Sequence, residues 1–182
     1  MSTLGLVETK SIAAGVLVAD IMMKRASVEL VKATTICSGR YMIQISGERE
    51  EVKTSVEAAR ESGVILAGTF VISNISPEVL AAMKHSPLVA RNNSLAVIEC
   101  KTATAGIAAA DAAVKESGVA LAKLVTGQGI MGKSYFVLAG ELTAVEAGTR
   151  AAELDLGKKL INAVVIPAPD DSVMNALIKV ER

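Results

Sequence analysis

Aliphatic runs of strand length recur along the first half of the chain. They are rich in Val, Ile and Leu and are bounded by turn residues, a pattern typical of half-buried β-strands. They cover residues 4–8, 28–35, 41–45 and 64–72. The second and third runs flank Cys37, Ser38 and Gly39, which predicts a hairpin with these three residues in the turn at its tip.

Two segments between these runs have helical periodicity. The first follows Ser11, a suitable N-cap, and places polar residues such as Asp20 and Lys24 between its apolar positions. These apolar positions are Ile12, Val16, Ala19, Met23 and Ala26. The second helix is predicted over residues 50–61, with Gly63 as a C-cap. Its predicted inward positions are Val52, Val56 and Ala59.

Together these elements follow the order β-α-β-β-α-β, and a further short helix is predicted from Pro77. This order predicts an α+β, ferredoxin-like fold, in which an antiparallel sheet carries its helices on one face. The other face of the sheet and its edges are then available to partners.

The same pattern occurs twice. Residues 4–35 align with residues 95–126 at a constant offset of 91 and share 12 identities in 32 positions. The match resumes at Gly39 and Gly132 with an offset of 93, so the second copy has two extra residues in the intervening loop. Self-similarity of this extent indicates a tandem duplication.

The duplication predicts two domains, at residues 1–90 and 91–182. A polar segment near residues 85–94 is expected to be the linker, because it contains Pro87 and two adjacent asparagines. By length alone, either one or two domains would be possible. The repeat decides for two.

Composition excludes several classes of protein. The chain has 182 residues, of which 51% are hydrophobic but only 2% aromatic, and 19 basic residues balance 19 acidic ones. A nucleic-acid binder normally has a basic excess or stacking aromatics, and a disordered chain has far less aliphatic content. The longest uncharged stretch, residues 62–77, contains Gly, Ser and Asn and is too short and polar to span a membrane. A net charge of zero puts little repulsion between copies.

The first residues show no basic segment ahead of an apolar one, so we expect no signal peptide and a cytoplasmic protein. Two cysteines, Cys37 and Cys100, are too few for a disulfide framework. In a reducing compartment, each is either a small buried hydrophobe or a reactive or ligating thiol. Cys100, in a strand beside Glu99, is predicted to be structural, and His85 in the linker is predicted to be solvated.

Several motifs, in the same order in both copies, resemble bacterial microcompartment shell domains. In the first copy they are residues 4–11, Ala19-Asp20, Lys24, residues 28–31, Ser38-Gly39 and Gly47-Glu48. In the second copy they are residues 95–101, Ala110-Asp111, Lys115, residues 119–121, Gly132-Lys133 and Gly140-Glu141. The resemblance covers nearly the whole chain. It implies a non-catalytic tandem shell protein, whose homotrimer forms a six-lobed tile that packs edge to edge with other shell proteins.

Residues 35–41 resemble, within that family, the pore loop of tandem shell proteins of the propanediol-utilisation type, in which a cysteine holds a 4Fe-4S cluster on the trimer axis. The resemblance implies that Cys37 from three subunits binds such a cluster, for electron transfer across the shell. A cubane cluster has threefold axes, so three symmetry-related thiolates can each ligate one iron. The second copy has Gln128 at the aligned position, so a trimer carries three such cysteines rather than six.

The resemblance also implies roles at the pore and at the tile edge. The expected pore-lining residues are Ser38, Gly39, Gln128, Gly129 and Met131. Lys24 and Lys115 are the candidates for the tile edge, and encapsulated redox enzymes are further expected partners. The chain departs from the family pattern after the last strand of each copy. Residues 73–76 and 167–170 lack the Arg-containing proline motif that many shell domains use at tile edges.

Two alternatives to a cluster-binding tile remain open. One is a shell tile whose pore passes a small metabolite without a cluster. The other is a small-molecule sensor or nucleotide-binding enzyme that uses residues 127–134, which match both GxxxxGK[ST] and GxGxxG. Both phosphate motifs need a helix directly after the loop, whereas residues 135–139 predict a strand, so a pore-loop hairpin is favoured. No catalytic set stands out, because the duplication alone explains why Glu8 and Glu99 occupy equivalent strand ends.

Overall fold

The computed structural model describes residues 3–84, 87–89 and 94–180, which form two compact units. The first unit consists of the described residues up to Ile75, together with Thr102–Ala105 and Gly127–Lys133. The second consists of the other described residues from Ser76 onward. The predicted domain boundary between residues 90 and 91, most of the predicted linker and His85 lie outside the described residues.

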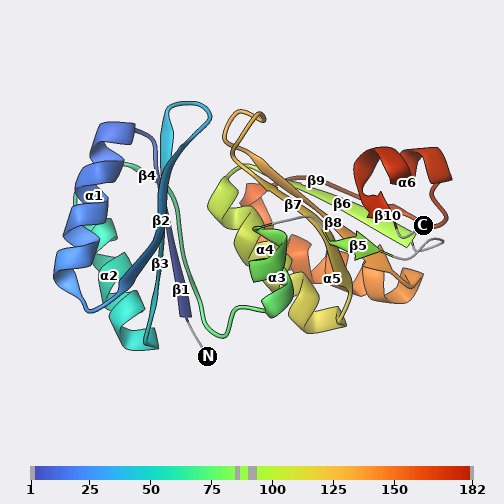
Figure 1. Ribbon diagram of the computed structural model, residues 1–182, viewed down its shortest axis with the longest axis horizontal. Helices are drawn as coiled ribbons and strands as arrows, with labels where there is room; N and C mark the ends of the chain where they lie inside the picture. Colours follow the sequence, from blue (N-terminus) through green and yellow to red (C-terminus); the bar gives the residue numbers. More distant parts are fainter. Residues whose placement is uncertain (1–2, 85–86, 90–93, 181–182) are drawn as a thin grey trace. The chain divides into compact units, whose positions relative to one another are not determined.

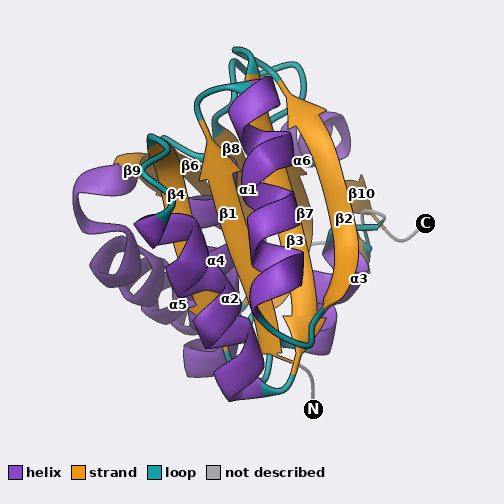
Figure 2. Ribbon diagram, turned by 90° about the vertical axis from the view of Figure 1, so that its left-hand side faces the viewer, coloured by secondary structure: helices purple, strands orange, loops and turns teal. Residues whose placement is uncertain are grey.

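The first unit contains every strand and helix predicted for the first copy up to residue 72. They are β1 (Thr3–Thr9), α1 (Ile12–Arg25), β2 (Glu29–Ile36), β3 (Arg40–Gly47), α2 (Arg49–Glu61) and β4 (Leu66–Ile72). The sheet has the order β2-β3-β1-β4, and every neighbouring pair of strands is antiparallel. Both helices lie on one face of this sheet (Figure 2), which confirms the predicted ferredoxin-like arrangement.

Helix α1 begins after Ser11, as predicted, but only part of its expected inward row faces the core. Ile12 and Val16 are exposed, whereas Ala19 and Met23 are partly buried and pack against the core cluster. The buried residues of the helix are Gly15, Val18 and Met22. A Cβ atom at Gly15 would collide with the side chain of Tyr41, so the absence of a side chain lets the helix approach β3 closely. Because of this close approach, the helix face formed by Gly15, Val18 and Met22 lies toward the sheet.

Helix α2 follows its sequence prediction. Its predicted inward residues Val52, Val56 and Ala59 are buried, and Gly63 after the helix has a φ of +73°. The three side chains belong to one apolar cluster between the two helices and the sheet. Its fully buried members are Val7, Val18, Met22, Ile43, Ile45, Val52, Val56 and Ala59.

The second unit repeats the fold. Its main elements are β6 (Ser94–Cys100), α4 (Ala103–Ser117), β7 (Ala120–Thr126), β8 (Ser134–Gly140), α5 (Leu142–Leu156), the 3-10 turn η1 (Gly157–Lys159) and β9 (Leu160–Ile166). The sheet order β7-β8-β6-β9 matches that of the first unit, and the long helices lie on one face (Figure 1). The start of α4, up to Ala105, groups with the first unit.

Short elements complete the second unit. They are α3 (Pro77–Ala82), which begins at the predicted proline, β5 (Leu88–Val89), α6 (Asp171–Leu177) and β10 (Lys179–Val180). Strands β5 and β10 pair in parallel as a separate ladder. No helix within the described ranges is both long and apolar enough to cross a membrane.

Candidate functional site

Cys37 lies at the tip of the hairpin between β2 and β3, in the predicted turn. Ser38 and Gly39 have φ values of +66° and +67°, so two consecutive left-handed residues reverse the chain. A Cβ at Gly39 would meet nothing within 4 Å, so the backbone conformation rather than space favours glycine here. Cys37 is partly exposed. The fold therefore presents one accessible thiol at a hairpin tip.

The loop Gly127–Lys133 belongs to the same compact unit as this hairpin and contacts the thiol. The N–H of Gly129 donates a hydrogen bond to Cys37 Sγ at 3.0 Å. In the other direction, the N–H of Cys37 donates to the carbonyl oxygen of Gly127 at 3.1 Å. Two hydrogen bonds thus tie the turn of the first copy to the corresponding loop of the second copy.

Gln128, the residue aligned with Cys37, lies beside it. Its Nε2 donates to the carbonyl oxygen of Thr35 at 2.8 Å, and its Oε1 lies 4.0 Å from Cys37 Sγ. Among the other predicted pore residues, Ser38 forms part of the Cys37 turn and Met131 is 75% exposed in the second loop. The structure therefore brings Gln128 and Gly129 directly to the thiol. Pore lining itself stays a prediction.

A buried carboxylate, Glu8, stabilises both the Cys37 turn and the loop Gly127–Lys133, although it was not among the predicted site residues. Glu8 is fully buried in β1, and Arg40 Nη1 donates to its Oε1 at 2.8 Å and to the carbonyl oxygen of Gly132 at 3.4 Å. The N–H and the hydroxyl of Thr104 each donate to Glu8 Oε2 at 3.2 Å. Duplication therefore explains the equivalent positions of Glu8 and Glu99, but not the ion pair of Glu8, which anchors the residue that follows the Cys37 turn.

A signal for this ion pair was present in the sequence. Glu8 is a carboxylate within an aliphatic strand, and fully buried carboxylates are rare unless they are paired. Arg40 directly follows the turn glycine and is the basic residue at the start of β3. Since β1 and β3 are neighbours in a ferredoxin-like sheet, the two charges could have been matched from the predicted topology.

Cys100 differs from Cys37 in its exposure to solvent. It lies at the end of β6 and is fully buried. Burial raises the pKa of its thiol to about 11, although a hydrogen bond with Ser134 partly opposes this effect. A neutral, inaccessible thiol is consistent with the structural role predicted for Cys100.

Iodoacetamide is expected to alkylate Cys37 and to spare Cys100 in the native protein near neutral pH. The thiolate is the reactive species, and the raised pKa of Cys100 keeps its thiol protonated at that pH. Peptide mass spectrometry after brief labelling checks the result, and labelling in denaturant is the control in which both cysteines react. Labelling of Cys100 as fast as Cys37 in the native protein would contradict the prediction.

The two predicted tile-edge lysines make equivalent ion pairs at i, i+4. Lys24 Nζ lies 2.7 Å from Asp20 Oδ2 on the exposed side of α1. Lys115 pairs with Asp111, which is buried and accepts a further hydrogen bond from the N–H of Ser76 at 2.7 Å. Both side chains are thus held along their helices, and their role at tile edges stays a prediction.

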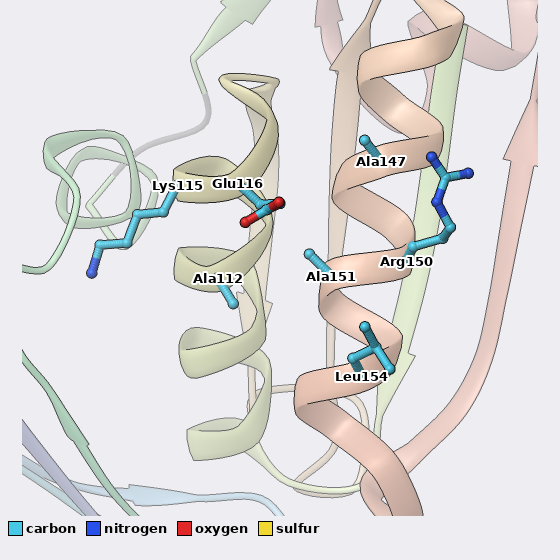
Figure 3. A pocket seen from close by; sticks show the side chains of 7 residues that line it. All are labelled: Ala112, Lys115, Glu116, Ala147, Arg150, Ala151 and Leu154. Atoms are coloured by element: carbon cyan, nitrogen blue, oxygen red, sulfur yellow. The ribbon is translucent and has the colours of Figure 1, made fainter.

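An open groove of about 710 Å³ lies between α4 and α5 in the second unit (Figure 3). Glu116 points toward α5, whereas Lys115 points away from it. The lining residues are Ala112, Lys115, Glu116, Ala147, Arg150, Ala151 and Leu154. Methyl groups and charged rim residues, without a nucleophile, histidine or cysteine, give this groove no catalytic set.

The loop after β7 does not have the structure of a phosphate-binding loop. Strand β8 begins at Ser134, as predicted, directly after the matching motif. The loop therefore lacks the helix N-terminus that both phosphate motifs require. The nucleotide-binding alternative has no support from this geometry.

A cluster at Cys37 fits the donor chemistry only if several copies share it. Across residues 3–84, 87–89 and 94–180, no three His, Cys, Asp or Glu side chains come together to hold a metal ion. One chain thus offers a single thiol at the hairpin tip. Its sulfur accepts an N–H hydrogen bond, a contact that stabilises thiolates and tunes iron-sulfur clusters. Each chain therefore supplies one thiol, Cys37, of a ligand set that three chains would share.

The sequence matches the family described as BMC domain twice, over residues 3–75 and 94–169. The chain therefore belongs to the bacterial microcompartment shell proteins and has two of their domains in tandem. Proteins of this family are structural components of the shells of microcompartments and carboxysomes, where they assemble with other shell proteins. The chain is accordingly a structural shell protein and not an enzyme.

Individual relatives support the same assignment. The bacterial microcompartment shell protein PduT of Citrobacter freundii is 32% identical over 179 residues, with 97% of each chain covered. The carboxysome assembly protein CcmO of Synechococcus elongatus is 31% identical over 197 residues, covering 96% of this chain and 68% of that protein. The crystal structure of a microcompartment protein from Desulfitobacterium hafniense DCB is 36% identical, with a TM-score of 0.78 over 95% of this chain and 98% of that one. The predicted resemblance to tandem shell proteins is thereby confirmed.

Proposed function

We propose that the protein forms a homotrimeric, pseudohexameric tile with a central pore, in which Cys37 from three subunits binds a 4Fe-4S cluster. The observation that carries this proposal is the thiol of Cys37, which is partly exposed at a hairpin tip and accepts a hydrogen bond at its sulfur. A cluster, when bound, would supply one-electron transfer across the shell, with encapsulated redox enzymes as its partners. Because Gln128 occupies the duplicate position, a trimer has three thiols at its hairpin tips, one from each Cys37.

Unequal burial of duplicated faces supports the trimer. Val16 in α1 is 53% exposed, whereas the aligned Ile107 in α4 is fully buried. The same holds for the aligned pairs Ile12 and Ala103, and Leu17 and Ala108. An apolar helix face that is covered in one copy and open in the other is expected to be covered by a second chain.

A head-to-tail ring supplies such a cover. Within the first unit, Gly68 of β4 lies against Thr104, so closely that a Cβ on the glycine would collide with the threonine hydroxyl. The residues aligned with this pair are Asn162 of β9 and Ala13 of α1, and both are exposed. Repeating the same contact between chains would place the α1 face of one subunit on β9 of the next. Heterologous contacts of this kind form a closed ring when the rotation between successive subunits closes.

Anaerobic purification, followed by cluster reconstitution, tests the proposal. We expect a brown protein with roughly four iron and four sulfide ions per trimer, because that is the composition of the cluster. Cys37→Ala is expected to abolish the colour and the iron while leaving the oligomer intact, since one thiol contributes little to a subunit interface. A wild-type protein that stays colourless and iron-free after reconstitution would refute cluster binding.

A pore that passes a small metabolite is the second candidate, and the same preparation separates the two. Its expected lining is Ser38, Gly39, Gln128 and Met131. An iron-free trimer whose permeability does not respond to oxidants or reductants would favour this alternative over the cluster.

A further inference from the structure

The loop Gly127–Lys133 folds back onto the hairpin between β2 and β3. Its left-handed residues, with φ between +57° and +76°, are Gly127, Gly129, Met131 and Gly132. Since the second copy has two residues more than the first at this point, its loop is longer than the turn with which it aligns. The extra length and the repeated left-handed residues let the loop coil back onto its neighbour.

Two of these glycines are required by close contact with the hairpin. A Cβ at Gly127 would come within 2.8 Å of Ile36 Cβ, and one at Gly132 would come within 3.0 Å of the carbonyl oxygen of Cys37. Any larger residue would push the loop away from the thiol. Close packing at both ends therefore fixes the middle of the loop, at Gln128 and Gly129, beside Cys37 Sγ.

We propose that Gln128 and Gly129 are positioning residues for the Cys37 sulfur, an inference that rests on the proposed cluster. The N–H of Gly129, 3.0 Å from Sγ, stabilises negative charge on the sulfur. The side chain of Gln128 holds the loop in place through its hydrogen bond to the carbonyl oxygen of Thr35. Hydrogen bonds to ligand sulfurs are among the factors that set the reduction potential of an iron-sulfur cluster. They stabilise the reduced cluster, which carries more negative charge than the oxidised one, and so raise the potential.

Because the chain contains two copies of the domain, the two aligned loops can carry different residues and have different roles. In a tile built from six identical domains, every loop would carry the same side chain at the tip. Here the first copy supplies the ligand, Cys37, while the second copy has exchanged that residue for Gln128 and holds the ligand instead. In the proposed trimer, each of the three Cys37 thiols is therefore paired with a second-copy loop that donates a hydrogen bond to its sulfur.

Hydrogen–deuterium exchange on the cluster-free protein tests the positioning contacts directly. In Gln128→Ala, amide exchange across residues 127–133 is expected to become at least about tenfold faster, since the hydrogen bond that holds the loop is lost. Cys37→Ala is expected to accelerate exchange in the same segment, because the Gly129 N–H loses its acceptor. Leu154→Ala, at an exposed position of α5 outside this loop, is the control and should match wild type. Wild-type exchange in both test variants would overturn the proposal.

The reduction potential of the reconstituted protein is the second measurement. We expect Gln128→Ala to shift the potential to a more negative value in a spectroscopically monitored redox titration, whereas Leu154→Ala should leave it unchanged. An unchanged potential in Gln128→Ala would overturn the tuning role. If the wild type takes up no iron, the proposed function fails, and the exchange experiment still decides whether the loop positions the thiol.

Discussion

Replacing Glu8 by alanine is expected to lower the free energy of unfolding by about 3 kcal/mol, a typical cost of breaking a buried ion pair from one side. Arg40 would lose its carboxylate partner at 2.8 Å, and the Thr104 N–H and hydroxyl would lose their acceptor at 3.2 Å. Because Glu8 is fully buried in β1, alanine leaves these donors facing a site where water cannot readily replace the carboxylate. Chemical denaturation of the variant and the wild type measures the difference.

The duplication supplies a matched control for this experiment. Glu99→Ala removes the same group from the equivalent position of β6, where the residue is only partly buried, so the loss of stability should be smaller. A double variant, Glu8→Met with Arg40→Leu, should recover part of the loss, since replacing both charges by apolar residues leaves neither of them unpaired. Equal losses for Glu8→Ala and Glu99→Ala would contradict the role assigned to the buried pair.

Most of the fold could be predicted from the sequence because local signals agreed with one another. The aliphatic runs became strands, Val52, Val56 and Ala59 became the buried face of α2, and the turn at Cys37 formed where expected. The repeat added certainty that neither copy could provide alone. An element order that occurs twice in one chain restricts the topology far more than a single pattern does.

The inward face of α1 could not be found in the same way. The helical spacing favoured the row that begins with Ile12 and Val16, of which only the later members Ala19 and Met23 pack against the core. The structure instead turns Gly15 toward β3, because a helix can approach a sheet most closely where it has no side chain. Hydrophobic periodicity assumes that all apolar residues point into the same core. Here Val18 and Met22 are buried, whereas Ile12 and Val16 are exposed.

The contacts at the candidate site also lie beyond the reach of local patterns. Cys37 and Gly129 are separated by 92 positions, and the hydrogen bond between them involves a backbone N–H, which every residue except proline offers. The sequence could predict two hairpin tips from the repeat. That one tip folds over the other follows from the left-handed glycines and from the two inserted residues, whose combined effect on the path of the loop requires coordinates.

Val16→Asp is expected to convert the proposed trimer to a monomer without unfolding the chain. The side chain is 53% exposed in the single chain, so an aspartate there can stay solvated in the monomer. In the proposed ring the same position is covered by β9 of the next subunit. A carboxylate without a partner in such an apolar contact costs about 3–5 kcal/mol at each of the three interfaces. Light scattering after size exclusion separates the monomer, 18.8 kDa, from a trimer of about 56 kDa (three times 18.8 kDa).

Leu154→Asp is the matched control, because it makes the same change at an apolar residue that is 85% exposed on α5, outside the proposed contact. It should remain trimeric, which would exclude a general effect of added negative charge. Circular dichroism must show the same helix and strand content for both variants, since loss of the fold would also remove the trimer. A folded Val16→Asp protein that still elutes as a trimer would mean that the exposed face of α1 is not a subunit interface. The ring inferred from the duplicated contacts would then have to be abandoned.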